Sequence, residues 1–171
     1  DDRAGCTALI LAVRELNPAA IAALKRKVIF VWSVREEVGL DGARAAAANL
    51  GPSVSRVYAV DTFVSSDSPL ESPRFADTPI GDGAVIRALD NASVTPPAET
   101  DRMLAIAKAR KIPVQVGTTN GGNDGSALTG LGAIDVPIGW PLRYSHSPAE
   151  VIDLRDVRSL ASLIRAAIAA P

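Results

Sequence analysis

Apolar and polar positions along the chain follow two patterns in turn. Apolar residues and alanines recur at helical spacing over residues 3–16, 41–50, 97–111 and 153–170, which predicts four helices. Short runs of apolar, mostly β-branched residues cover 27–34, 54–60, 85–89, 114–116 and 134–138, which predicts strands. Because strands alternate with helices and no segment is repeated, the pattern predicts one layered α/β domain.

The longest apolar run, residues 27–34 with the sequence KVIFVWSV, is typical of a strand buried on both faces of a sheet. It ends at Arg35, Glu36 and Glu37. Ligands of open α/β sheets bind beyond the carboxyl ends of strands, so these adjacent carboxylates are a candidate site. One glutamate could hold a metal ion while the other moves a proton. The alternative is a solvated start to a helix, where acidic residues suit the helix dipole.

Two further candidates also follow predicted strands. Asp61 comes directly after 54–60, and His146, the only histidine, comes shortly after 134–138. If those strands are parallel neighbours, their ends converge with Glu36 and Glu37 at one edge of the sheet. Carboxylates and an imidazole without thiolates suit zinc, cobalt or manganese. A divalent cation would also remove the repulsion among the carboxylates. The alternative is that His146 is purely structural.

Composition narrows the classes of partner and compartment. The chain has 171 residues, with 18 Lys and Arg against 19 Asp and Glu, so its charge gives no reason to expect nucleic acid or a membrane surface as a partner. Cys6 is the only cysteine, which excludes an intrachain disulfide and a cysteine-based zinc site. No apolar run reaches transmembrane length and no signal pattern opens the sequence, so we expect a cytoplasmic protein. Since the first residue is Asp, we expect a piece of a longer reading frame.

Other catalytic motifs are weak or missing. The glycine-rich segment 121–125 lacks the lysine and hydroxyl of a phosphate-binding loop, so nucleotide binding is disfavoured against an ordinary connection. The sequence has no Gly-x-Ser-x-Gly elbow, and Cys6 has no histidine near it in the sequence, which disfavours a nucleophilic hydrolase. The segment 62–79, rich in Ser, Pro and Asp, is predicted to be a long functional or mobile loop.

Several short blocks occur in an order that is distinctive. They are DDRAG, VREEVGLDGA, VYAVD followed by SSDSP, GDGAVI, GGNDGSA and PLRYSHSPAEVIDLRDV. Over nearly all of its length the chain resembles the glutamyl aminopeptidase and tetrahedral aminopeptidase family of dizinc metallopeptidases, some of which carry the label cellulase. The resemblance implies a three-layer α/β sandwich with a mixed, largely parallel sheet. It also implies two bound divalent ions, with zinc expected and cobalt or manganese as alternatives, and peptide substrates. The full-length protein is expected to be a homo-oligomer.

The resemblance also implies roles for individual residues. Asp1 resembles the carboxylate that bridges the two metal ions, and Glu36 resembles the general base. Glu37 and His146 resemble the terminal ligands of one ion, and Asp61 resembles a ligand of the other. Arg143 and Tyr144 match the family's loop beside the site.

The sequence departs from the family in one respect. The family takes a further histidine ligand from an N-terminal segment, which is followed by a small assembly domain, and neither occurs in residues 1–171. We therefore expect residues 1–171 to be the C-terminal portion of the catalytic domain, without its first strands or a second domain, and inactive alone. Two alternatives stay open: a non-catalytic remnant or subunit that binds a partner chain through an unpaired edge, and a glycoside hydrolase.

Overall fold

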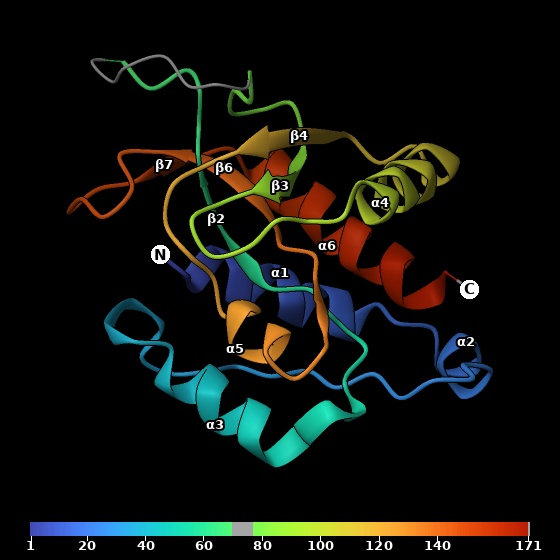
Figure 1. Cartoon of the computed structure of the whole chain (residues 1–171). Helices are drawn as coiled ribbons and strands as arrows, with labels where there is room; N and C mark the ends of the chain where they lie inside the picture. The colour runs from blue at the N-terminus through green and yellow to red at the C-terminus, as the bar shows by residue number, and fades with distance from the viewer. Residues whose placement is uncertain (70–76, 171) are drawn as a thin grey trace.

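The structure, a computed structural model, describes residues 1–69 and 77–170 (Figure 1). Its helices are α1 (Arg3–Arg14), α2 (Pro18–Ala22), α3 (Asp41–Leu50), α4 (Pro97–Arg110), α5 (Ser126–Thr129) and α6 (Leu154–Ala169). The 3-10 helices are η1 (Glu36–Val38) and η2 (Gly51–Ser53). The strands are β1 (Arg56–Val57), β2 (Val60–Val64), β3 (Ala84–Leu89), β4 (Val114–Thr118), β5 (Ile134–Asp135), β6 (Ile138–Arg143) and β7 (Val151–Ile152).

A five-stranded mixed sheet forms the centre of the molecule. Four strands lie in the order β2-β6-β3-β4, and β7 pairs with β6 off this path. The β2 and β6 pair and the β3 and β4 pair are parallel, whereas β6 runs antiparallel to β3 and β7. The strands β1 and β5 form a separate parallel pair. The predicted α/β class with a mixed, largely parallel sheet is confirmed.

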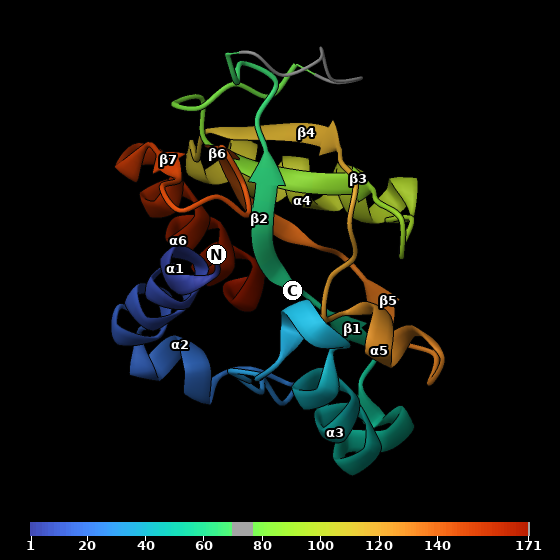
Figure 2. The same cartoon turned by 90° about the vertical axis from the view of Figure 1, so that its left-hand side faces the viewer.

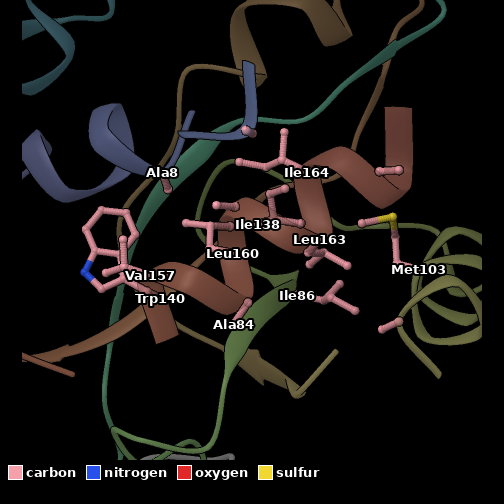
Figure 3. Close-up of a cluster of buried hydrophobic side chains, with 14 of the residues drawn as sticks. Ala8, Ala84, Ile86, Met103, Ile138, Trp140, Val157, Leu160, Leu163 and Ile164 are labelled. Carbon is pink, nitrogen blue, oxygen red and sulfur yellow. The ribbon is translucent and has the colours of Figure 1, made fainter. Parts of the chain in front are cut away.

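Helices α1, α4 and α6 cover one face of this sheet. Helix α6 contacts both of the other helices and the strands β3 and β6, and Figure 1 shows it between α1 and α4. Figure 2 shows α1 and α6 on one side of β2, with α3 and α5 lying away from them. The side chains that fill this interface form the main core, including Ala84, Ile86, Met103, Trp140 and Leu160 (Figure 3).

The predicted helices match the structure closely because their ends are specified locally. The carboxylate of Asp2 accepts from the backbone N–H of Gly5 at the start of α1, and Asp153 caps α6 in the same way. Helix α3 covers the predicted residues and ends before Gly51, whose φ of 61° suits glycine. The carboxylate of Asp156 is buried and accepts from the N–H groups of Gly81 and Gly83, which ties the chain before β3 to α6.

Two predicted strands are displaced along the sequence. The range 54–60 contains only β1 and the first residue of β2, so Asp61 lies inside β2 and does not follow the end of a strand. The range 134–138 is interrupted at Val136 and Pro137, and the chain resumes as β6. The predicted loop 62–79 begins later than expected because β2 continues to Val64, and residues 70–76 of it lie outside the described part.

The prediction of a buried strand at 27–34 is wrong. These residues belong to no helix or strand and run as an extended trace below α1 in Figure 1. Ile29 is 42% exposed and Val34 is 65% exposed. The carbonyl of Val34 accepts from the N–H of Gly42, which fixes the end of the segment against the start of α3. Strand propensity does not form a strand by itself, since a ladder needs a partner along its whole length.

Replacing Leu160 with Ala tests the core beneath the sheet. Leu160 has no exposed surface, so Leu160→Ala should lower the free energy of unfolding by about 2–5 kcal/mol. Leu154 begins the same helix but is 64% exposed, and Leu154→Ala should change stability by less than about 0.5 kcal/mol. Urea denaturation followed by circular dichroism measures both, and similar losses in the two variants would contradict this assignment of the core.

Candidate metal centre

Asp1, Glu37 and His146 come together from three distant parts of the chain. Asp1 precedes α1, Glu37 lies in η1, and His146 follows β6. His146 Nε2 lies 3.4 Å from Asp1 Oδ2 and 3.3 Å from Glu37 Oε2. One donor atom from each residue lies within 4.8 Å of the other two, a grouping that could hold a metal ion.

The spacing of these donors fits a small divalent cation. Donors around a tetrahedral zinc ion at about 2.0–2.1 Å are separated from one another by about 3.3–3.4 Å. The distances from His146 to Asp1 and Glu37 have this size. Two carboxylates and one imidazole also leave a fourth position for water or substrate, as in catalytic zinc sites.

Backbone contacts place His146 beside Asp1. The carboxylate of Glu150 accepts from the backbone N–H of His146 at 3.1 Å and from the backbone nitrogen of Asp1 at 2.7 Å. Tyr144 and His146 both have positive φ values, 63° and 58°, in the turn that follows β6. This turn points the imidazole back toward the start of α1. Glu150 was not among the residues predicted from the sequence, although it lies four positions after His146.

A second set of acids lies next to the first. The hydroxyl of Thr62 in β2 donates to Asp1 Oδ2 at 3.4 Å. Burial, and in smaller part the charge of Glu37, raises the pKa of Asp61, so Asp61 also lies near the first group. Burial, followed by the charge of Asp61, raises the pKa of Asp2 to about 7. Burial also raises the pKa of Glu36 to about 7, and the charges of Asp61, Glu37 and Asp124 add to the rise. Because the charge of Asp61 acts on both, Asp2 and Glu36 share one partly desolvated region with it.

Asp61 is held close to a buried arginine. Burial raises the pKa of Asp61, while the nearby charge of Arg87 opposes the rise. Arg87 Nη1 lies 3.5 Å from Asp61 Oδ2, and the N–H of Thr62 donates to Asp61 Oδ1 at 2.6 Å. The structure therefore brings Asp61 into the acidic region as predicted, but from within a strand. Neither Arg87 nor Asp2 was predicted to contribute to the site.

Arg143 and Tyr144, predicted to lie in a loop beside the site, differ in their contacts. Arg143 ends β6 and forms an ion pair with Asp67, which fixes the chain after β2 against β6. Its Nε lies 3.3 Å from Asp67 Oδ1. Tyr144 is exposed at the turn that leads to His146. Their roles toward a substrate stay predictions.

The raised pKa values predict an unusual dependence of stability on pH. Ordinary carboxyl groups release their protons near pH 4 in the unfolded chain, whereas Asp2 and Glu36 release theirs near pH 7 in the folded chain. The folded chain therefore binds more protons in this window, and the free energy of unfolding of the metal-free chain should fall as the pH rises from about 4 to 7.

Asp2→Asn isolates one contribution to this slope. An asparagine can still cap α1 but carries no charge, so the metal-free variant should be more stable than the unmodified chain at about pH 8 by an amount on the order of 1 kcal/mol. Urea midpoints at about pH 5 and about pH 8 measure the change. An Asp2→Asn variant with an unchanged slope would show that Asp2 is not a buried titrating group.

No helix in residues 1–69 and 77–170 is long and apolar enough to cross a membrane.

Comparison with known proteins places the chain among peptidases. A putative aminopeptidase of Acetivibrio thermocellus is 30% identical over 171 residues, covering 98% of this chain and 49% of that protein. The structure of the TET1 peptidase of Pyrococcus horikoshii, described as assembling into a tetrahedron or a large octahedral shell, matches with a TM-score of 0.84 and 36% identity. That match covers 98% of this chain and 47% of the other.

A protein from Thermotoga maritima described as an endoglucanase also matches, with a TM-score of 0.72 and 28% identity over 98% of this chain and 47% of its own. The chain thus spans about half the length of the relatives it matches. The family model for the M42 glutamyl aminopeptidases matches residues 1–163. The blocks that carried the resemblance extend through the same residues, and the chain belongs to the M42 glutamyl aminopeptidase family.

Proposed function

We propose that this chain carries metal-ligand and general-base residues of a metal-dependent aminopeptidase, which removes N-terminal residues from peptides. The observation that carries the proposal is the convergence of Asp1, Glu37 and His146 at the spacing of zinc donors. A second ion would be held by Asp1, as the bridging ligand, and Asp61. Zinc fits the donor set, and cobalt and manganese are the alternatives.

Bound divalent ions would acidify a water molecule and polarise the carbonyl of the scissile peptide bond. The carboxylates of Asp1, Glu37 and Asp61 orient and hold the ions, and their charges also favour a substrate with a free α-ammonium group. The imidazole of His146 contributes a neutral donor, which limits the negative charge at the ion. Asp1, Glu37 and His146 lie outside the sheet, before α1, in η1 and after β6, whereas Asp61 lies inside β2.

Glu36 fits the role of general base. It neighbours Glu37 in η1 but is more buried, and its pKa is raised to about 7 by that burial and by the acids around it. A carboxylate with a pKa near 7 can take a proton from water and then give it to the leaving amine. Glu37, which is more exposed, stays available as an ion ligand.

The relatives suggest how the whole protein assembles. Because the Pyrococcus horikoshii TET1 peptidase is described as forming closed shells, we propose that the parent of this chain is also a homo-oligomer that acts on peptides. This proposal concerns a protein of the relatives' length, of which the chain spans about half.

A second candidate is a subunit that binds a partner chain without catalysing a reaction. The observation that favours it is the exposed apolar segment 27–34, in which Ile29, Val31, Trp32 and Val34 are all exposed. Exposed apolar strand-like segments are typical sites of strand addition. Metal binding separates the two candidates, because a partner-binding subunit has no need of the Asp1, Glu37 and His146 geometry.

A glycoside hydrolase is a third candidate, since the Thermotoga maritima relative is described as an endoglucanase. Two carboxylates are sufficient for that reaction, but an imidazole at metal-ligand spacing has no part in it. Parallel assays with a dipeptide amide and a soluble glucan distinguish the reactions, and glucan hydrolysis that survives removal of metal would favour this candidate.

Glu37→Gln should weaken binding of Zn²⁺ to the metal-stripped chain by at least about tenfold, because one charged donor is lost. Asp41→Asn is a matched control: its side chain is 54% exposed against 53% for Glu37, and it lies outside the donor group. His146→Ala should resemble Glu37→Gln. Calorimetric titration measures all three, and unchanged affinity in His146→Ala would return His146 to a structural role.

Glu36→Gln should leave metal content nearly unchanged while lowering the hydrolysis rate of a peptide amide by about 10²–10⁴-fold, the usual contribution of a general base. The measurement needs a protein extended to the length of the relatives, with metal content determined by elemental analysis. Loss of metal in Glu36→Gln would mean that the two glutamates have exchanged roles. An N-acetylated substrate serves as control, since it should be a poor substrate for either form.

A further inference from the structure

We propose that Glu150 is a positioning residue for the metal ion assigned to Asp1, Glu37 and His146. The inference rests on the proposed function to the extent that these three residues are ion ligands. Glu150 lies outside the donor group and was not among the residues expected to form the site. Its side chain is 19% exposed, whereas that of His146 is 67% exposed, so a largely buried carboxylate supports an exposed ligand.

His146 lies in the connection between two antiparallel strands. Strand β6 ends at Arg143, which pairs with Val151 at the start of β7, and residues 144–150 join the two strands. Glu150 is the last residue of this connection, so the pairing of β6 with β7 fixes its backbone. It therefore offers His146 a hydrogen-bond acceptor that is itself anchored in the sheet.

The backbone of His146 needs such an acceptor. Its φ of 58° lies in the left-handed region, as does the φ of 63° at Tyr144, and a residue with a side chain holds this conformation only where its surroundings maintain it. The N–H of His146 donates to Glu150 Oε1 at 3.1 Å. Without this carboxylate the turn could relax, and Nε2 of His146 would lose its place beside Asp1 and Glu37.

The other oxygen of Glu150 reaches a second segment of the donor group. Oε2 accepts from the backbone nitrogen of Asp1 at 2.7 Å, while Oε1 accepts from His146. One carboxylate thus fixes two ligands that are far apart in the sequence. Because both of its oxygens accept from backbone nitrogens, Glu150 acts on the ion through the positions of the ligands. Ligands that are held in place before the ion arrives lose less conformational freedom when it binds.

Glu150→Ala tests the inference in the metal-stripped chain titrated with Zn²⁺ and followed by calorimetry. The variant should bind Zn²⁺ about 10–100-fold more weakly, as is usual when a residue that orients a ligand is lost. Glu150→Gln removes the charge but keeps an amide oxygen that can accept one of the two hydrogen bonds, so it should weaken binding by a smaller factor. Equal weakening in both variants would show that only the charge matters and would overturn the inference.

Asp153→Ala is the matched control. Asp153 also accepts from a backbone N–H, that of Arg155 at 2.8 Å, and its side chain is 23% exposed. Because it caps α6 and lies outside the donor group, Asp153→Ala should lower stability but leave the affinity for Zn²⁺ unchanged. Circular dichroism confirms folding of each variant, and Glu150→Gln replaces Glu150→Ala if the latter does not fold. An equal loss of affinity in Asp153→Ala would overturn the inference.

Nuclear magnetic resonance separates the inference from the proposed function, because His146 is the only histidine and its imidazole signals are unambiguous. In the metal-free chain, the backbone amide hydrogen of His146 should exchange with water several-fold faster in Glu150→Ala than in the unmodified chain. Added Zn²⁺ should shift the Nε2 signal of the unmodified chain, since Nε2 faces Asp1 and Glu37. Unchanged amide exchange or unchanged affinity in Glu150→Ala would overturn the inference alone, whereas an Nε2 signal that does not respond to Zn²⁺ would overturn the proposed function.

Discussion

Repulsion among neighbouring carboxylates limits which of the acids around the candidate metal centre can be ionised at the same time. Asp2, Glu36 and Asp61 are partly removed from water, and the charge of Asp61 raises the pKa of both Asp2 and Glu36. Arg87 is a cation that lies beside one of them, Asp61. Ionising every acid in this region is therefore costly, and the cost falls only if protons or further cations are bound. A bound divalent ion would lower this cost, which is consistent with the proposed metal site.

The fold offsets this repulsion with packing that does not depend on the acids. Gly5 lies so close to Trp140 that an added side chain would overlap the indole, and Trp140 belongs to the buried core. Gly139 in β6 passes the carbonyl of Asp61 at a distance that leaves no room for a side chain. The segments that carry Asp2 and Asp61 therefore pack closely against the core. Backbone packing brings their charges together.

Sequence reasoning succeeded where local rules decide and failed where distant partners decide. Helices α1, α3, α4 and α6 were predicted well because caps, glycines and helical spacing are local signals. The segment 27–34 has strong strand propensity but no partner ladder in the described part of the chain. The site shows the same division. The grouping of Glu37 with His146 follows from motifs, whereas Arg87 and Glu150 are recognised only through contacts between segments far apart in sequence.

The segment 27–34 lies outside the sheet, so the position of the candidate site depends on loop contacts. Since 27–34 is not held in the sheet, Glu36 and Glu37 are positioned by the contacts at its end, from Ser33 to Asp124 and from Gly42 to Val34. An ion bound by Asp1, Glu37 and His146 would join the start of α1, η1 and the turn after β6, three segments that the sheet does not connect directly at this point. Because an ion that binds only the folded form adds its binding free energy to stability, the acids that destabilise the empty site would hold it together once the ion is bound.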